Sequence, residues 1–296
     1  MRENITKCEV CQSDNIRIAQ TVTDHSISKE KFNIAECQDC GFTFTQNPPL
    51  EAECGIYYQS EDYISHSNTN KGIIFRVYHM VRKIMLGQKS RLLKKYKATP
   101  RLLDIGSGTG YFLKYMSDHG YEVEGIEVDD GARAYSQENF KLKVNPPDIL
   151  KNGGIKQQFG YITLWHVLEH LYGPNEYWQI FHQLLEASGY LLVAVPNHLS
   201  SDAKHYGEYW AAYDVPRHLW HFNPHTLSLM AENNGFEVID KKMMPFDPFY
   251  NSMLSEKYMK NTAGLFRGGW TGLISLIQGA INVNKASSII YVLKKK

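Results

Sequence analysis

The glycine-rich segment RLLDIGSGTGYFL, residues 101–113, places the tightest limits on what this chain can fold into. Gly106, Gly108 and Gly110 alternate with other residues directly after an apolar run. Such a run before a turn is typical of a buried parallel strand, and the residues after the turn have the pattern of a helix that ends at Gly120. The backbone of a turn of this kind approaches bound ligands closely, so we expect it to belong to a binding site.

The spacing of the glycines indicates which ligand the turn accepts. A phosphate-binding P-loop would close with Lys followed by Ser or Thr, and this turn has neither. In the dinucleotide fingerprint the third glycine follows the second by three residues, where this chain has Tyr111. Asp104 adds a negative charge just before the turn, which disfavours a pyrophosphate. A cationic or hydroxyl-rich ligand therefore suits the turn better than a phosphate.

The chain after the turn repeats the alternation of strand and helix. Residues 121–130, YEVEGIEVDD, are predicted to form a second strand that ends in acids, and residues 130–140 a second helix. This alternation predicts an α/β fold with a doubly wound, mostly parallel sheet that binds ligands at the carboxyl ends of its strands. Glu127 lies at such an end, where an acid accepts hydrogen bonds from ribose hydroxyls.

An acid at the end of the first strand, G-x-G-x-G, and an acid at the end of the second strand together resemble the class I methyltransferases. The resemblance covers residues 101–296 and implies a Rossmann-like, seven-stranded sheet that closes with an antiparallel strand at SSIIYVLKKK. It also implies S-adenosylmethionine as the cofactor. The residues that it assigns to the cofactor are Asp104, Gly106, Ser107, Gly108 and Gly110 at the amino-acid and ribose end, Glu127 on the ribose, Val128 and Asp148 at the adenine, and Trp165 and His166 in the remaining wall.

The cysteines of the N-terminal part form two C-x-x-C pairs, Cys8 with Cys11 and Cys37 with Cys40. Four thiolates on two tight turns suit the tetrahedral coordination of zinc. Gly41 directly after the second pair lets that turn close around an ion. We therefore expect a structural zinc ion held by these four cysteines in a small ribbon of short strands, with reduced, metal-free thiols as the alternative.

A narrower likeness rests on several segments at once. WHVLEHL, VPNHLS, GEYWAAYDVPRHLWHFNPHTL and a cysteine knuckle followed by NPPLE together resemble a bacterial group of methyltransferases with N-terminal zinc ribbons. That group includes sugar C-methyltransferases and members with cell-surface polysaccharide functions. The resemblance implies an acceptor related to carbohydrates.

Two candidate catalytic residues lie in the loop HYGEYWAAYDVPRHLWHF, residues 205–222, and a third, His166, lies at the carboxyl end of the predicted strand that runs out at Leu164. The loop follows a predicted strand, so we expect it to lie over the methyl group. A base is needed where the acceptor atom keeps a proton. His218 is the first candidate, ahead of His166 and Tyr213, because the neighbouring Arg217 offers a cation to an acceptor anion.

A metal site in HVLEH is an alternative role for part of this set. His166, Glu169 and His170 have the i, i+3, i+4 spacing of chelating side chains, provided that the segment is helical.

Three parts of the chain are expected. They are a zinc-ribbon-like module over residues 1–50, a helical cap or linker over 51–98, and an S-adenosylmethionine-binding domain over 99–296 with an insertion at 245–286. The insertion contains AGLFRGGWTGLISLIQGAINV, which glycines and Arg267 interrupt too often for a membrane span. A lid or a protein contact such as a homodimer is favoured over docking on a membrane surface, since this segment has few Lys or Arg.

The overall composition sets the remaining limits. A net charge of +1 provides no general attraction for nucleic acid or anionic membranes. The N-terminal residues lack a signal-peptide pattern, so a cytoplasmic location is expected. The main hypothesis is methyl transfer to a small molecule, namely a sugar, nucleotide sugar or glycolipid. The alternatives are an RNA methyltransferase that contacts nucleic acid through the ribbon, and a non-catalytic binding module.

Overall fold

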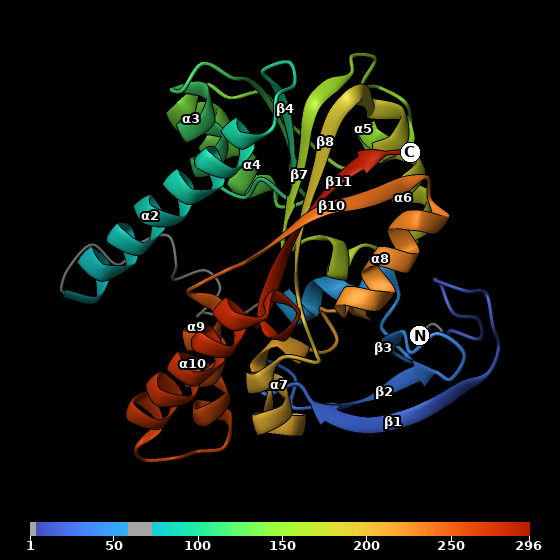
Figure 1. Ribbon diagram of the computed structural model, residues 1–296, viewed down its shortest axis with the longest axis vertical. Helices are drawn as coiled ribbons and strands as arrows, with labels where there is room; N and C mark the ends of the chain where they lie inside the picture. Colours follow the sequence, from blue (N-terminus) through green and yellow to red (C-terminus); the bar gives the residue numbers. More distant parts are fainter. Residues whose placement is uncertain (1–3, 59–72) are drawn as a thin grey trace.

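The computed structural model describes residues 4–58 and 73–296, with the backbone alone for residues 73–78. Residues 59–72, which fall in the predicted helical cap, lie outside the described part. Two sheets organise the molecule, one of seven strands and one of four (Figure 1). The strands are β1 (Ile16–Thr23), β2 (Lys31–Cys37), β3 (Thr43–Thr45), β4 (Arg101–Ile105), β5 (Glu122–Ile126), β6 (Val144–Asn145), β7 (Phe159–Trp165), β8 (Leu185–Pro196), β9 (Trp220–His221), β10 (Phe236–Met243) and β11 (Ser288–Lys295).

The seven-stranded sheet has the order β10-β11-β8-β7-β4-β5-β6. β4 pairs in parallel with both β5 and β7, so the direction of winding reverses between β4 and β7. β11 runs antiparallel to β8 and to β10. The predicted fold class is therefore confirmed, and the carboxyl ends of β4, β5 and β7 meet at the reversal point, where ligands bind in sheets of this type.

Helices cover both faces of this sheet (Figure 1). They are α2 (Ile73–Lys95), α3 (Tyr111–Ser117), α4 (Asp130–Phe140), α5 (Asp148–Lys151), α6 (Pro174–Leu184), α7 (Ser201–Tyr206), α8 (Pro224–Asn233), α9 (Asp247–Tyr258) and α10 (Gly264–Ile281). Short 3-10 helices connect them: η1 (Glu51–Tyr58), η2 (Leu168–His170), η3 (Gly207–Tyr209), η4 (Ala211–Tyr213) and η5 (Val283–Lys285).

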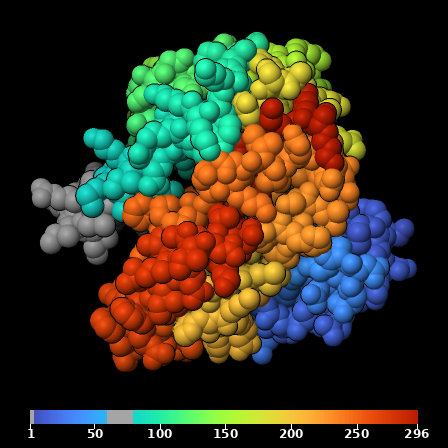
Figure 2. Space-filling model, in the orientation of Figure 1, coloured from blue at the N-terminus to red at the C-terminus, as the bar shows by residue number. Residues whose placement is uncertain are grey.

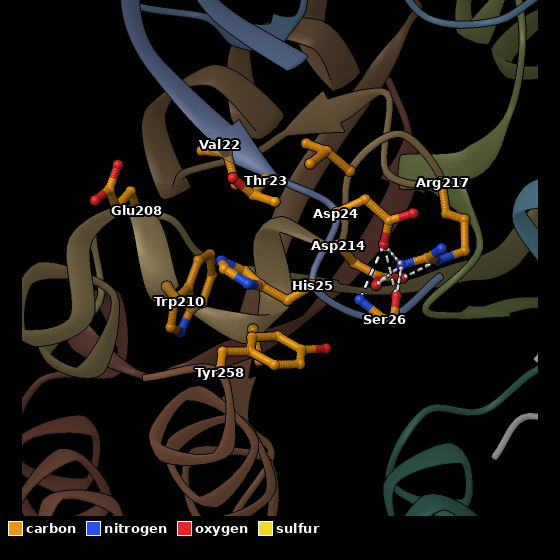
Figure 3. A pocket seen from close by; sticks show the side chains of 12 residues that line it. Val22, Thr23, Asp24, His25, Ser26, Glu208, Trp210, Asp214, Arg217 and Tyr258 are labelled. Atoms are coloured by element: carbon orange, nitrogen blue, oxygen red, sulfur yellow. Dashed lines mark hydrogen bonds and ion pairs between the residues drawn. The ribbon is translucent and has the colours of Figure 1, made fainter. Parts of the chain in front are cut away.

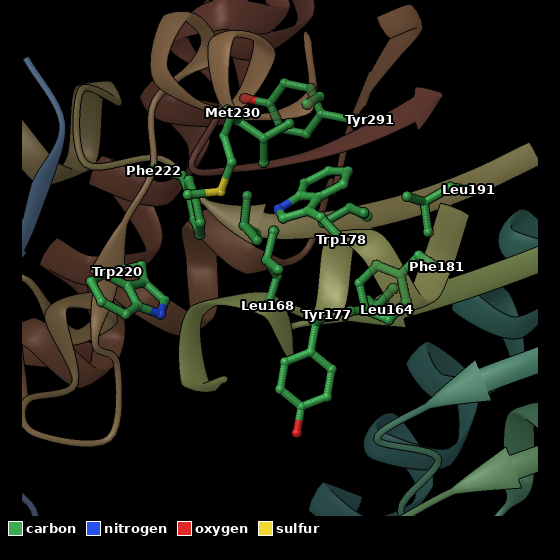
Figure 4. Packing of buried hydrophobic residues seen from close by; sticks show 14 of the residues in the cluster. Leu164, Leu168, Tyr177, Trp178, Phe181, Leu191, Trp220, Phe222, Met230 and Tyr291 are labelled. Carbon is green, nitrogen blue, oxygen red and sulfur yellow. The ribbon is translucent and has the colours of Figure 1, made fainter. Parts of the chain in front are cut away.

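Alternate residues of the central strands enter two different cores, because successive side chains of a strand point to opposite faces. Leu102 packs with α2 and α3 residues, whereas Leu103 packs with the core of α6 and α8. Figure 4 shows this second core around Trp178, with Met230 and Tyr291 on one side of the indole. The nearly continuous apolar run of each parallel strand follows from this burial on both faces.

One boundary differs from the sequence pattern. The helical pattern predicts a helix as far as Gly189, but α6 ends at Leu184 and β8 begins at Leu185. Leu185 is fully buried and lies opposite Phe159 of β7. Because Leu185 is buried in the sheet, residues 185–189 belong to β8 and not to α6.

The N-terminal ribbon is continuous with the rest of the molecule. β9, from the loop after β8, pairs with β3 and completes the four-stranded sheet. Cys8, Phe42 and Phe44 belong to the same hydrophobic cluster as Trp178. The ribbon and one face of the large sheet therefore share one core.

α9 and α10 form a helical hairpin between β10 and β11. In Figure 2 the hairpin is the red and orange lobe at the lower left of the surface. The described residues include no helix with the length and apolar character needed to cross a membrane.

Candidate active site

The three glycines of the turn after β4 each have a positive φ, of 71°, 54° and 79° for Gly106, Gly108 and Gly110. A Cβ on Gly106 would lie 2.4 Å from Val167 Cγ2, and one on Gly110 would lie 2.9 Å from Ser136 Oγ. Around Gly108, by contrast, no heavy atom of the described residues beyond its chain neighbours lies within 4 Å of that position. Close packing around Gly106 and Gly110 thus leaves no room for a side chain at either position, whereas Gly108 leaves open space beside the turn.

Glu127, directly after β5, is tied to this turn. Its carboxylate accepts hydrogen bonds from the backbone N–H groups of Gly108 at 2.7 Å, Val128 at 2.8 Å and Asp129 at 2.9 Å. The side chain of Val128 beside it is 76% exposed. The end of β5 therefore presents a carboxylate and an open apolar surface next to the space at Gly108.

Asp104 of β4 lies two residues before the turn and is almost fully buried. It accepts a hydrogen bond from Thr163 Oγ1 at 2.6 Å. Burial raises the pKa of Asp104 to about 7, although the Thr163 hydrogen bond and the nearby charge of Lys89 act in the opposite direction. Burial also lowers the pKa of Lys89 to about 8, against the charges of Asp104 and Asp247. The Lys89 ammonium nitrogen lies 4.1 Å from the centre of the Trp165 ring.

Two buried polar atoms near the turn have no hydrogen-bond partner among the described residues, namely Ser107 Oγ and Trp165 Nε1. Most buried polar atoms in proteins are paired, so a polar ligand would fit here. Asp148 is exposed in the first turn of α5, shortly after β6.

His166 follows β7 with a left-handed backbone, at φ 58°. Its Nδ1 lies 3.3 Å from Glu169 Oε1, and its Nε2 lies 2.9 Å from Asp247 Oδ2. Burial by itself would lower the pKa of His166, but hydrogen bonds and charge from Asp247 and Glu169 raise it to about 10. His166 is therefore an imidazolium at neutral pH that joins the start of α9 to the end of β7.

The segment HVLEH does not form the helix that the metal alternative requires. Only residues 168–170 are helical, as η2, so His166 and His170 point to different partners. One ligand atom each of Glu169, His170 and His218 lie within 4.8 Å of one another instead. The group of possible metal ligands in the structure therefore contains His218, and not His166, together with Glu169 and His170.

The rings of His170 and His218 meet edge to face, with centroids 4.6 Å apart. His218 Nδ1 lies 2.9 Å from the carbonyl oxygen of Ala212, and His170 Nδ1 lies 2.9 Å from that of Arg217. A carbonyl oxygen only accepts, so each Nδ1 carries a proton and each Nε2 points away from that carbonyl oxygen. Burial, followed by the charge of His218, lowers the pKa of His170 to about 4.

Arg217, beside His218, is held by groups of the protein itself (Figure 3). Its guanidinium donates to Asp214 Oδ2 at 2.9 Å, to Asp24 Oδ1 at 3.3 Å and to the carbonyl oxygen of Tyr57 at 2.8 Å. Two carboxylates already balance its charge, which differs from the expectation that it offers a cation to an acceptor.

The aromatic residues of the same loop divide into two groups. Trp210 is buried and donates its indole N–H to Asp202 at 2.8 Å, so it fastens the loop to the core. Tyr213 is buried beside it. Tyr209 instead stacks on His25 of the ribbon, and the His25 ring also stacks on Tyr258 of α9.

A cavity of about 1390 Å³ lies beside the ends of β7 and β8. His166, His170 and His218 line it, whereas Tyr213 is not among its described lining residues. Its other walls include residues 25–27 and Lys29 of the ribbon, residues of the loop after β8, and residues of α9 and of the segment just after it. The volume exceeds that of most small-molecule pockets, so a ligand of considerable size fits.

The four N-terminal thiols form a compact group, as predicted. The Sγ atoms of Cys8 and Cys40 are 3.5 Å apart, as are those of Cys11 and Cys37, and all four lie within 4.8 Å of one another. A zinc–sulfur bond of roughly 2.3 Å gives tetrahedral edges of roughly 3.8 Å, so this arrangement fits a zinc ion.

Lys89 and Asp247 were not among the candidates from the sequence. Lys89 interrupts the apolar stripe of α2, between Leu86 and Leu93, and this placement of a lysine was the available signal. Nothing in the local sequence connects Asp247 with His166, since only the fold brings α9 to the end of β7.

A family model described as a methyltransferase domain matches residues 78–241. Among curated proteins, a ubiquinone biosynthesis O-methyltransferase of Ruegeria pomeroyi is 27% identical over 164 residues, which are 50% of this chain and 64% of that protein. The chain thus spans less than two thirds of the length of the curated relatives that it matches.

Solved structures share the fold at low sequence identity. A SAM dependent methyltransferase from Archaeoglobus fulgidus is 18% identical with a TM-score of 0.50, covering 76% of this chain and 100% of that one. The magnesium protoporphyrin IX methyltransferase from Synechocystis PCC 6803 with bound SAH is 9% identical with a TM-score of 0.52, covering 81% and 97%.

Proposed function

The chain belongs to the methyltransferase-domain family, and on that premise we propose that it transfers a methyl group from S-adenosylmethionine to a small-molecule acceptor, namely a sugar, nucleotide sugar or glycolipid. The observation that carries this proposal is that the glycine turn follows β4, while His166, which follows the neighbouring parallel strand β7, lines the large cavity. Glu127 accepts a hydrogen bond from Gly108 of the turn, and the cavity has a volume of about 1390 Å³. Val167, the next residue after His166, packs against Gly106 of the turn, so the turn and the cavity lie at the ends of adjacent strands.

The residues around the turn fit S-adenosylmethionine, which supplies a methyl group on a sulfonium. The open side at Gly108 lets the backbone approach the ligand, and Glu127 accepts hydrogen bonds from the ribose hydroxyls. Val128 packs on the adenine, and Asp148 faces its amino group. Lys89 balances the carboxylate of the methionine part. The remaining assigned contacts are Asp104, Gly106, Ser107, Gly110, Trp165 and His166.

The chemical step needs position and one base. Methyl transfer is an in-line displacement, so alignment of the two reactants supplies much of the rate. His218 Nε2 takes the acceptor's proton as the acceptor atom bonds to the methyl carbon and the carbon–sulfur bond breaks. Asp214 Oδ2, 3.9 Å from Nε2, stabilises the imidazolium that results. His166 acts as a positioning residue, because its ion pairs hold α9 against β7.

The walls of the cavity suit a carbohydrate that carries a phosphate. Tyr209 and Tyr258 offer aromatic surface to the faces of a sugar ring. Lys29, Lys257 and Lys260 supply positive charge along the same cavity. The curated relatives are named O-methyltransferases, so a hydroxyl oxygen is the first acceptor atom to test.

The four cysteines hold a structural zinc ion in this proposal. Cys8, Cys11, Cys37 and Cys40 fill all four tetrahedral positions, which leaves none for water or substrate. The ion supports the ribbon, and the ribbon in turn forms one wall of the cavity.

The test is an assay of the full chain with S-adenosylmethionine and a panel of nucleotide sugars, sugar phosphates and glycolipids, with RNA in a parallel arm. Mass spectrometry should detect one added methyl group on a carbohydrate acceptor, together with an equal amount of S-adenosylhomocysteine. Methylation of RNA alone, or failure of S-adenosylmethionine to bind, would contradict the proposal.

A further inference from the structure

Helix α10 packs against α9 through its small residues. Gly268, Gly272, Ser275 and Gly279 are the buried residues of this helix. A Cβ on Gly268 would lie 2.7 Å from Met253 Cα, and one on Gly272 would lie 2.8 Å from the Cα of the facing α9 residue. The close approach of the two helices therefore depends on the glycines, and it leaves the large side chains of α10 on the outside.

These large side chains form a continuous surface, which we call the α10 apolar face. Leu265, Phe266 and Ile281 are each 80% exposed, and Trp270 is 60% exposed. The face consists of Leu265, Phe266, Trp270, Leu273, Ile274, Ile277 and Ile281. Exposed apolar surface of this extent on one helix marks an interaction site more often than free surface.

The exposed charges of the insertion all have one sign. The acids of the insertion, Asp247 and Glu256, are partly or fully withdrawn from solvent, and they pair with His166 and Arg267 respectively. The basic residues of the insertion, Lys257, Lys260, Arg267 and Lys285, are all exposed. The expectation of few cations considered the helix alone, whereas the insertion as a whole exposes four basic residues, of which Lys257 and Lys260 also line the large cavity. An apolar surface that carries anionic groups complements this arrangement.

Neither of the favoured alternatives fits this arrangement. A lid would turn its apolar side chains toward the cavity, but the cavity wall in the described hairpin comes from α9 and the residues just after it. A two-fold dimer would place the same surface of both copies together, and so would bring the exposed positive charges of two insertions toward one another.

We propose that the α10 apolar face docks on the surface of an anionic lipid bilayer. The helix lies in the headgroup region, with its apolar side chains in the acyl boundary and the cations at lipid phosphates. α9 connects this surface to the cavity, because Tyr250, Leu254 and Tyr258 line the cavity from the same hairpin. On the proposed function, on which this last step rests, docking brings the acceptor site to the membrane and favours a lipid-linked acceptor.

The test is co-sedimentation of the full chain with vesicles of phosphatidylcholine alone and of phosphatidylcholine with phosphatidylglycerol. We expect binding to the anionic vesicles, and about tenfold or greater loss of binding in the variant Phe266→Ser/Trp270→Ser/Ile277→Ser. The matched control is Ile18→Ser/Ile56→Ser, which removes exposed apolar side chains from other surfaces and should bind as the unaltered protein does. Lys260→Glu/Lys285→Glu should reduce the preference for anionic lipid.

Two further measurements keep the outcomes distinct. Thermal unfolding and S-adenosylmethionine binding should be unchanged in the triple variant, so a failed methyl-transfer assay and a failed vesicle assay remain separate results. The proposal is overturned if the unaltered protein does not bind anionic vesicles, or if the triple variant binds them equally well. It is also overturned if light scattering shows that the unaltered protein is a dimer and that the triple variant is a monomer, because the α10 apolar face would then be buried between two copies of the chain.

Discussion

Arg217 Nη2 donates a hydrogen bond to Asp24 Oδ1 at 3.3 Å, and this contact joins the loop after β8 to the turn between β1 and β2. Both side chains are buried. His25 directly follows Asp24 and His218 directly follows Arg217, and both histidines line the large cavity. The ribbon therefore helps to set the position of the residue that we propose as the base.

Replacement of Asp24 by Asn should lower the free energy of unfolding at pH 7 by about 2 kcal/mol. Burial opposes the ionised form, but the backbone N–H of Ser28 and the charge of Arg217 outweigh it and lower the pKa of Asp24 from 3.8 to about 2. A depressed carboxyl pKa stabilises the fold above about pH 4 and loses this effect as the pH falls toward 2. Urea unfolding across this range should show the difference from the unaltered protein shrinking.

The control for Asp24 is Glu36→Gln, which removes a solvent-exposed ion pair with Arg17 at 3.5 Å. An exposed pair contributes little, so its unfolding free energy should change by less than about 0.5 kcal/mol. A gap between Asp24→Asn and the unaltered protein that stays constant down to pH 2 would contradict the assigned pKa.

Glu127→Gln should weaken S-adenosylmethionine binding by roughly ten- to a hundredfold, since a charged hydrogen bond contributes about 1.5 to 3 kcal/mol. Asp104→Ala should also weaken it, because Asp104 is one of the assigned cofactor contacts and its carboxyl joins β4 to β7 through Thr163. Calorimetric titration measures both effects. Glu122→Gln, an exposed residue at the other end of β5, is the matched control. Unchanged affinity in Glu127→Gln and Asp104→Ala together would remove the cofactor assignment.

His218→Gln should reduce kcat by about two to four orders of magnitude at saturating acceptor, which is the usual contribution of a general base. Affinity for S-adenosylmethionine should stay the same, because His218 lies in the cavity and not at the glycine turn. His225→Gln alters an exposed histidine and should keep full turnover. Near-normal turnover in His218→Gln would exclude it as the base.

Removal of zinc should lower the melting temperature of the whole protein in one transition. Cys8 and Phe42 share a hydrophobic cluster with Trp178 of α6, so loss of the ribbon exposes the core of the large sheet as well. Metal analysis should find one zinc ion per chain, and none in Cys37→Ser. Cys54→Ser should retain the ion, since Cys54 is not in the cysteine group. A metal-free protein with an unchanged melting temperature would rule out the structural role.

The sequence by itself determined the features that depend on neighbouring residues. The strand before Gly106, the turn and the acid at Glu127 follow from short-range burial and backbone conformation, and the fold class follows from their alternation. The two C-x-x-C pairs likewise predicted the cluster of four thiols, because each pair lies on one tight turn. These are patterns that a few consecutive residues encode.

The tertiary structure alone decided which distant residues meet. The pairing of β9 with β3, the meeting of His170 with His218, and the ion pair of His166 with Asp247 depend on strand order and on the path of the loops. Tertiary packing also determines that the large side chains of α10 point outward, because the glycines of this helix pack on α9. Hydrophobic periodicity says that a helix has an apolar face, but only packing determines whether that face is buried.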